Sequence, residues 1–198
     1  MNAINKIRHH IVNSSSKAVF SAQTFQAFAS PENARQILCR LVKSGEIEPI
    51  SRGVFAKKTT VAASELPSSK EIVQFLTDLT GEVISIHGSE AARKLGLSTQ
   101  VPMSLIYYTT GNSRKIKFKN RTITLKHISP RKLIGHGIVG EAFIALWYLG
   151  KENVNSQTIK KIKTQLKPND FKVLKNEIPH MPAWMAKAFH LYLQQETA

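Results

Sequence analysis

The sequence contains few of the residues on which metal-dependent hydrolysis and nucleotide binding usually depend. Aspartate occurs only as Asp78 and Asp170, so no closely spaced aspartate pair exists for a two-metal site. The seven histidines show no HExxH spacing and have no cysteine pair that could complete a zinc site. A G-x-S-x-G elbow, a Walker loop and a GxGxxG motif are also absent. The sequence therefore gives no positive case for an enzyme, a bound metal or a cofactor.

Cysteine and long apolar runs are equally scarce. The single cysteine, Cys39, excludes an internal disulfide and fits a reducing cytoplasm. The N-terminal MNAINKIRHHIV lacks the continuous apolar stretch of a signal peptide. The longest apolar run, residues 142–149, falls far below the roughly 18 residues that a membrane span requires. We therefore expect a soluble, cytoplasmic protein with no membrane partner.

Positive charge is abundant and spread along the whole chain. The 28 Lys and Arg residues exceed the 13 Asp and Glu residues by 15, and the isoelectric point is near 10.1. Counted in three segments, the excess is +6 for residues 1–60, +6 for residues 61–135 and +3 for residues 136–198. The charge therefore lies on folded surfaces and not on a tail. It favours a polyanionic partner, with nucleic acid first, an acidic membrane second and an acidic protein third.

The distribution of apolar and turn-forming residues predicts an α+β protein with two domains. Residues 1–58 are the first domain, the polar residues 59–70 are a linker, and residues 71–198 are the second. The second domain is mixed α/β to about residue 135 and helical over 136–198. We expect helices over 2–13, 22–28, 31–44, 68–79, 89–95, 136–150, 155–166, 168–176 and 182–195. We expect strands over 47–50, 54–56, 82–86, 105–108, 115–119 and 122–127.

The helix over 31–44 has well-defined ends and two different faces. Serine and proline at positions 30 and 31 favour its start, and Gly45 ends it. An apolar stripe is formed by Ala34, Ile37, Leu38, Leu41 and Val42. Cys39 borders that stripe, so we expect a packed thiol and not a reactive one.

The polar face of this helix is chemically suited to reading DNA. Asn, Arg and Gln side chains pair with adenine or guanine edges in the major groove. A helix, a second helix, a turn, a third helix and a two-stranded hairpin follow in the order of a winged helix-turn-helix domain. A merely solvated face is the plainer alternative. The predicted DNA-binding residues are Asn33, Arg35, Gln36, Arg40, Lys43 and, at the tip of the hairpin, Arg52.

A second basic surface is predicted on the strand pair over 115–127. Ile116 and Phe118 alternate with lysines, so one face is apolar and the other carries four or five unpaired positive charges. We expect the turn at residues 120–121. The basic face is either a site for phosphates or an acidic partner, or a soluble outer face protected at its edge by lysine. Its residues are Arg114, Lys115, Lys117, Lys119, Arg121 and Lys126.

Two stretches resemble a known family, the AbiEi-type antitoxins of bacterial type IV toxin–antitoxin (abortive infection) systems. The first is ARQILCRLVKSGEIEPISRGVFAKK, at residues 34–58. The second is SIHGSEAARKLGLSTQVPMSLIYYTTGNSRKIKFKNRTITLKHISPRKL, at residues 85–133. Many winged helices share the first pattern. The second is more distinctive, because it combines HGSEAA, LGLSTQVP and G-x-S-R before a basic hairpin.

The resemblance implies a repressor that binds the promoter of its own operon as double-stranded DNA. It also implies a second domain that counteracts a toxin resembling a nucleotidyltransferase, without requiring a stable complex. Two alternatives remain at this point: a transcriptional regulator without a toxin, whose second domain senses a ligand or dimerises, and a divergent metal-dependent nuclease. RNA binding through the lysine hairpin also stays open, although no stacking aromatic residues accompany those lysines.

Overall fold

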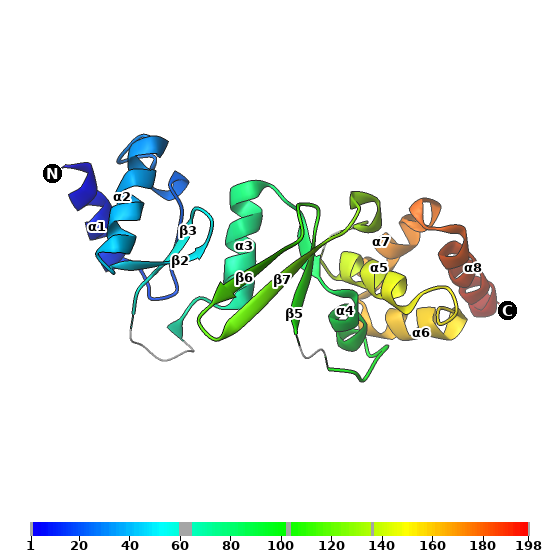
Figure 1. Cartoon of the computed structure of the whole chain (residues 1–198). Helices are drawn as coiled ribbons and strands as arrows, with labels where there is room; N and C mark the ends of the chain where they lie inside the picture. The colour runs from blue at the N-terminus through cyan, green and yellow to red at the C-terminus, as the bar shows by residue number, and fades with distance from the viewer. Residues whose placement is uncertain (1, 60–64, 102–103, 136, 198) are drawn as a thin grey trace. The chain divides into compact units, whose positions relative to one another are not determined.

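The computed structural model describes residues 2–59, 65–101, 104–135 and 137–197, and they form a mixed α+β structure (Figure 1). The chain divides into two compact units, each made of two separate stretches. Unit 1 comprises Met1–Glu82 and Arg114–Ile123, and unit 2 comprises Val83–Ser113 and Thr124–Ala198. Unit 1 is therefore larger than the predicted first domain of residues 1–58. Of the predicted linker, residues 60–64 lie outside the described residues.

The N-terminal part of unit 1 packs helices against a small antiparallel sheet, drawn in blue and cyan in Figure 1. Its elements are α1 (Ala3–Asn13), β1 (Val19–Phe20), η1 (Gln23–Phe25), α2 (Pro31–Lys43), β2 (Ile47–Ser51) and β3 (Val54–Lys57). The strand order is β1-β3-β2. These elements share one apolar core, which buries Ile7, Phe20, Phe25, Leu38 and Ile47.

Helix α2 begins and ends where its sequence predicts. The Ser30 side chain accepts a hydrogen bond from the backbone N–H of Asn33 at 3.4 Å, and proline occupies the first helical position. At the other end Gly45 adopts a φ of +75°, a left-handed conformation that favours glycine. Four residues of the predicted stripe are buried, namely Ala34, Ile37, Leu38 and Leu41, and the fifth, Val42, is half-buried.

The segment before α2 differs from the prediction. Instead of an α-helix over 22–28, the chain forms only the 3₁₀ helix η1, preceded by the unexpected strand β1. A helix this short gains too few hydrogen bonds to offset the cost of nucleation. Ring packing sets the position of η1. The centroid of the Phe25 ring lies 5.5 Å from that of His10 and 5.8 Å from that of Phe20.

The rest of unit 1 consists of α3 (Ser69–Thr80), β6 (Arg114–Phe118) and the first residues of β7 (Arg121–His127). Helix α3 begins with a capping box in which Ser68 and Glu71 exchange side-chain and backbone hydrogen bonds. It ends at Gly81, whose φ is +69°. Both ends agree with the helix predicted over 68–79.

Unit 2 contains the remainder of the chain's regular structure. Its elements are β4 (Ile84–Ile86), α4 (Gly88–Lys94), β5 (Leu105–Thr109), the end of β7, η3 (Pro130–Lys132), α5 (Gly137–Leu149), α6 (Ser156–Gln165), α7 (Pro168–Asn176), η4 (Ile178–His180) and α8 (Ala183–Thr197). Strand order in the second sheet is β4-β5-β7-β6. Strand β4 is shorter than the strand predicted over 82–86, and its three residues are half-buried.

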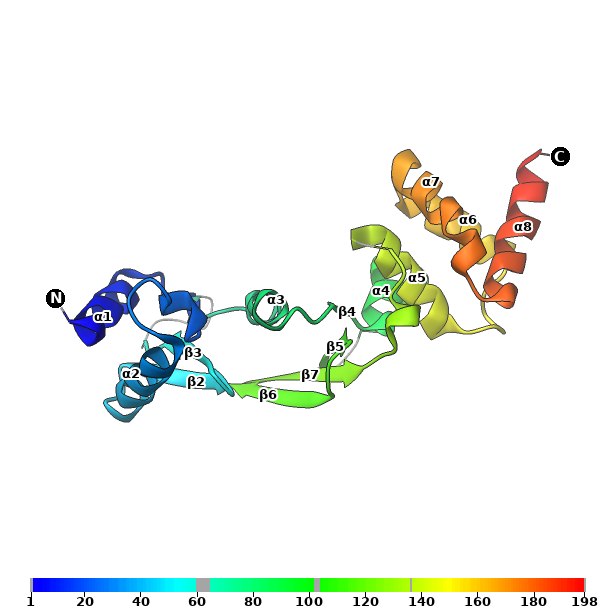
Figure 2. The same ribbon diagram turned by 90° about the horizontal axis from the view of Figure 1, so that it is seen from above.

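The core of unit 2 lies mainly among helices. In both views α4 lies beside α5, and α6 lies beside α8 (Figures 1 and 2). Phe143, Leu146, Ile159 and Phe189 are completely buried in this core. No helix in the described stretches is both long enough and apolar enough to cross a membrane.

Candidate nucleic-acid interface

The outward face of α2 presents the side chains that the sequence predicts for base contacts. In the described structure, no ion pair and no hydrogen bond to another residue engages these side chains. They are therefore available to a partner without first breaking an internal contact. All five of these predicted residues of α2 are exposed: Asn33, Arg35, Gln36, Arg40 and Lys43.

Arg35 of α2 and Arg52 of the β2–β3 turn line the same hollow, which has a volume of about 670 Å³. Arg52 is exposed at the turn, next to Gly53 with its φ of +75°. Cys39 also lines this hollow and is exposed, so the expectation of a packed thiol was wrong. The physical reason is that Cys39 follows the buried Leu38 by about 100° around the helix, which carries it off the apolar stripe.

Two sets of contacts hold α1 against the elements around α2. Arg8 Nε donates to Glu46 Oε2 at 2.7 Å, and Arg8 Nη2 donates to Glu46 Oε1 at 2.9 Å. The hydrogen bond from Arg8 holds the pKa of the Glu46 carboxyl below its ordinary value. Lys57 Nζ donates to the carbonyls of Val12 and Ser14, at 2.6 Å and 3.2 Å. It thereby satisfies carbonyl oxygens at the C-terminal end of α1.

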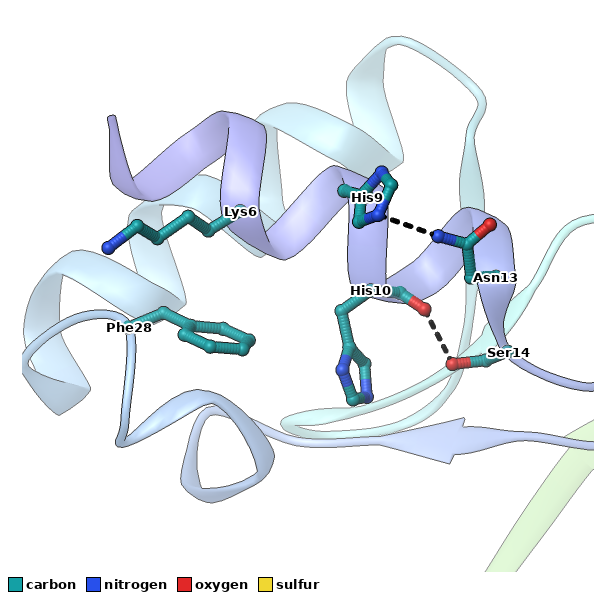
Figure 3. Close-up of a pocket in the computed structure, with 6 residues that line it drawn as sticks. All are labelled: Lys6, His9, His10, Asn13, Ser14 and Phe28. Atoms are coloured by element: carbon teal, nitrogen blue, oxygen red, sulfur yellow. Dashed lines mark hydrogen bonds between the residues drawn. The ribbon is translucent and has the colours of Figure 1, made fainter. Parts of the chain in front are cut away.

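A further hollow of about 370 Å³ lies beside α1 and contains none of the predicted DNA-binding residues (Figure 3). His9 Nε2 and Asn13 Nδ2 are 2.9 Å apart, and Ser14 Oγ donates to the carbonyl of His10 at 2.6 Å. The His10 ring packs edge-on against Phe28, with 5.9 Å between the centroids. These contacts account for the two histidines as packing and helix-end residues. Throughout the described residues, no group of three or more His, Cys, Asp or Glu side chains could hold a metal ion.

The alternation predicted for the β6–β7 hairpin is present. Its inward side chains are buried, and Lys115 and Lys117 are exposed. The turn lies at residues 119–120, one position earlier than predicted, and Lys119 has a φ of 53°. The buried set is Ile116, Phe118, Ile123 and Leu125.

Half of the predicted basic surface is engaged in contacts within unit 1. Arg114 donates to Glu82 at 3.2 Å and 2.9 Å. Lys119 Nζ lies 2.7 Å from Glu48 Oε2. A third contact joins Arg121 to the carbonyl of Pro67 at 3.2 Å. The expectation of four or five unpaired charges was therefore wrong. The acidic partners of Arg114 and Lys119 are distant in sequence. Among the six residues, only the side chains of Lys115, Lys117 and Lys126 have neither an ion pair nor a hydrogen bond in the described structure.

Lys126 belongs to unit 2 and contributes to a different hollow there, of about 280 Å³. The other side chains of this hollow were not predicted as site residues, because three separate segments of the chain supply them. They include Tyr108, His127, Lys132, Trp147 and Tyr148.

Residues 6–174 of the chain match a family of unknown function, DUF6088. The chain belongs to this family. The region that defines DUF6088 includes α2, both hairpins and the hollow of unit 2. No curated protein and no solved structure matches the chain. Membership of DUF6088 leaves the choice among a DNA-binding, an interaction and an enzymatic role to the chemistry of the surfaces described above.

Proposed function

We propose that this member of DUF6088 is a sequence-specific DNA-binding regulator whose α2 helix reads the major groove. In this proposal η1, α2 and the β2–β3 hairpin act as a winged helix-turn-helix, with η1 in the place of the usual second helix. Arg52, at the tip of the hairpin, contacts the DNA backbone or the minor groove. The protein would then bind the promoter of its own operon and repress it.

One observation carries the proposal: α2 keeps an exposed arginine and an exposed glutamine free beside a second arginine on the hairpin. Arg35 and Gln36 can each form two hydrogen bonds to a purine edge, which gives base discrimination. Arg35 and Arg52 line one hollow, so a single phosphate-bearing strand could contact both elements. The net charge of +15 supplies the long-range attraction.

The antitoxin role extends this proposal and rests on the resemblance of residues 34–58 and 85–133 to AbiEi-type antitoxins. Repression would depend on α2, whereas neutralisation of a nucleotidyltransferase-like toxin would depend mainly on unit 2. A regulator without a toxin remains the alternative.

The DNA-binding proposal is tested by measuring the affinity of the full chain for its own promoter and for random duplex DNA. Replacing both Arg35 and Gln36 with alanine should cost on the order of 1–3 kcal/mol per base contact and reduce sequence preference. In the control variant, alanine replaces Lys172 and Gln100, which are exposed in unit 2. Like the α2 variant, the control loses one positive charge and one side-chain amide. Equal losses of specific and random affinity in the α2 variant would show that α2 does not read bases.

The antitoxin proposal is tested in cells by inducing a neighbouring nucleotidyltransferase-like toxin beside a promoter reporter. The variant with alanine at Arg35 and Gln36 should lose repression and still restore growth. If this variant is folded and abundant and growth is not restored, protection works through repression, and the assignment of neutralisation to unit 2 is wrong.

A further inference from the structure

We propose that the hollow of unit 2 binds one nucleotide, with its phosphate beside Lys126 and Lys132 and its base against the exposed ring of Tyr148. The nucleotide is either free or part of a single strand. This site belongs to unit 2 and does not depend on the duplex-reading role proposed for α2 of unit 1. It lies among the end of β7, η3 and α5.

The charge of the hollow suits a phosphate. Lys126, His127 and Lys132 line it, and no acidic side chain does so among its described lining residues. Neither Lys126 nor Lys132 forms an ion pair with a described carboxylate. The positive field is therefore not cancelled locally, and an anion would gain charge-assisted hydrogen bonds there.

The histidine is held in a fixed orientation. His127 Nδ1 lies 2.9 Å from the carbonyl oxygen of Gly111, and the His127 backbone N–H donates to Ser113 Oγ at 2.8 Å. A carbonyl oxygen only accepts, so Nδ1 carries the hydrogen and Nε2 is left for a ligand. Such positioning reduces the entropy lost on binding.

The aromatic side chains suit a base. Tyr148 is 42% exposed although it is large and largely apolar. Its ring lies 5.7 Å from His87, whose ring lies 4.7 Å from that of Tyr108. Burial first, and the charge of Lys126 second, lower the pKa of His87, so its ring is neutral near pH 7. Neutral aromatic faces of this kind stack on nucleobases without regard to sequence.

Trp147 also lines the hollow, where its ring contacts Lys132. Lys132 Nζ lies 4.8 Å from the centroid of the Trp147 ring, which positions the ammonium group by a cation–π contact. The indole N–H of Trp147 is buried without a hydrogen-bond partner in the described structure. Lys132 is exposed, and this contact places its ammonium group over the Trp147 ring at the hollow.

The size of the hollow limits what can enter. A volume of about 280 Å³ lies just below the range for small-molecule sites, roughly 300–1,000 Å³. It has room for no more than one nucleotide with an unstacked base, and it excludes a paired duplex. The occupant is therefore a mononucleotide or one nucleotide of a single strand.

The test measures binding of the full chain to a fluorescent single strand of about eight nucleotides and to the four common mononucleotides, at about 0.15 M salt. The variant Lys126→Gln, Lys132→Gln should bind at least tenfold more weakly than the unaltered chain. Tyr148→Ala should weaken binding by about five- to a hundredfold, the range of a lost base–aromatic stack. Circular dichroism confirms that each variant is folded.

The matched control is Lys172→Gln, Lys187→Gln, which removes the same charge from exposed residues of unit 2 outside the hollow. Retained affinity in this control, and in the variant with alanine at Arg35 and Gln36, supports the proposal independently of duplex binding. Binding of mononucleotides as tightly as the strand identifies a free nucleotide, and binding of the strand alone identifies a single-stranded partner. Equal losses in control and hollow variants would overturn the proposal. So would absence of binding, or displacement of the probe by inorganic phosphate as effectively as by nucleotides.

Discussion

Arg8 in α1 and Glu46 in the turn after α2 form an ion pair with two parallel hydrogen bonds, of 2.7 Å and 2.9 Å. The pair joins residues that are 38 positions apart in the sequence. It fixes α1 against the C-terminal end of the proposed DNA-reading helix. Its energy is moderated by solvent, because the two side chains are 44% and 31% exposed.

This pair predicts a pH-dependent contribution to stability. Because the folded-state pKa of Glu46 is lowered, its contribution is present above the pKa of an unfolded glutamate, about 4.3, and is lost as the pH falls through the folded value. Glu46→Gln should therefore lower the Tm at pH 7, with a smaller difference near pH 3. Thermal unfolding followed by circular dichroism measures the change in Tm at each of the two pH values. The control Glu152→Gln changes an exposed glutamate in unit 2, and an equal effect there would contradict the prediction.

Arg52→Ala should weaken the binding of promoter and random duplex by the same factor. Arg52 lies at the turn of the hairpin, where the proposal gives it a phosphate contact and no base contact. The slope of log K against log salt should shrink by about one. Lys187→Ala, an exposed change in unit 2, should leave the slope unchanged. A selective loss of promoter affinity would instead make Arg52 a base-reading residue.

Replacing Lys115 and Lys117 with alanine distinguishes a phosphate-binding hairpin from a solvated one. If both contact phosphates, the salt slope for duplex binding should shrink by up to about two. Lys119 is left in place because it pairs with Glu48 at 2.7 Å, and removing it would leave that carboxylate without its partner. An unchanged slope would identify the outer face of the hairpin as solvent-exposed surface only.

Gly88→Ala should destabilise the protein by about 1–3 kcal/mol, the usual cost of overpacking. A Cβ atom at this position would lie 2.3 Å from the Cβ of Tyr148 and 3.1 Å from the carbonyl oxygen of Ile144. Helices α4 and α5 would have to separate. Urea denaturation measures the loss, with Thr99→Ala as an exposed control nearby. A stability within about 0.5 kcal/mol of the unaltered chain would show that α5 yields easily.

Local signals predicted the elements that matter most for the proposed interface. The cap at Ser30, the apolar stripe and Gly45 define α2 from residues within one segment, and the structure confirms each of them. Alternation along β6 likewise predicted which side chains are buried. In such cases the chemistry of neighbouring residues determines the outcome, so sequence alone is sufficient.

Contacts between distant segments could not be predicted in the same way. Glu48 and Glu82 neutralise cations that follow them by 71 and 32 positions, and no local pattern indicates either pairing. The hollow of unit 2 combines residues near positions 108, 127 and 147, which become neighbours only after folding. The prediction of a helix over 22–28 was also wrong, because the Phe25 ring packs against that of Phe20 in the core and the segment forms only η1.

The division of the chain has a consequence for its synthesis. Ribosomes release a protein from its N-terminus, and domains generally fold in that order. Here Arg114–Ile123 belongs to unit 1, although residues 83–113 of unit 2 are made first. A nascent chain that has already exposed α2 must therefore wait for about thirty more residues beyond Glu82 before the last part of unit 1 emerges. Any product terminated within that interval carries the proposed reading helix in an incomplete unit.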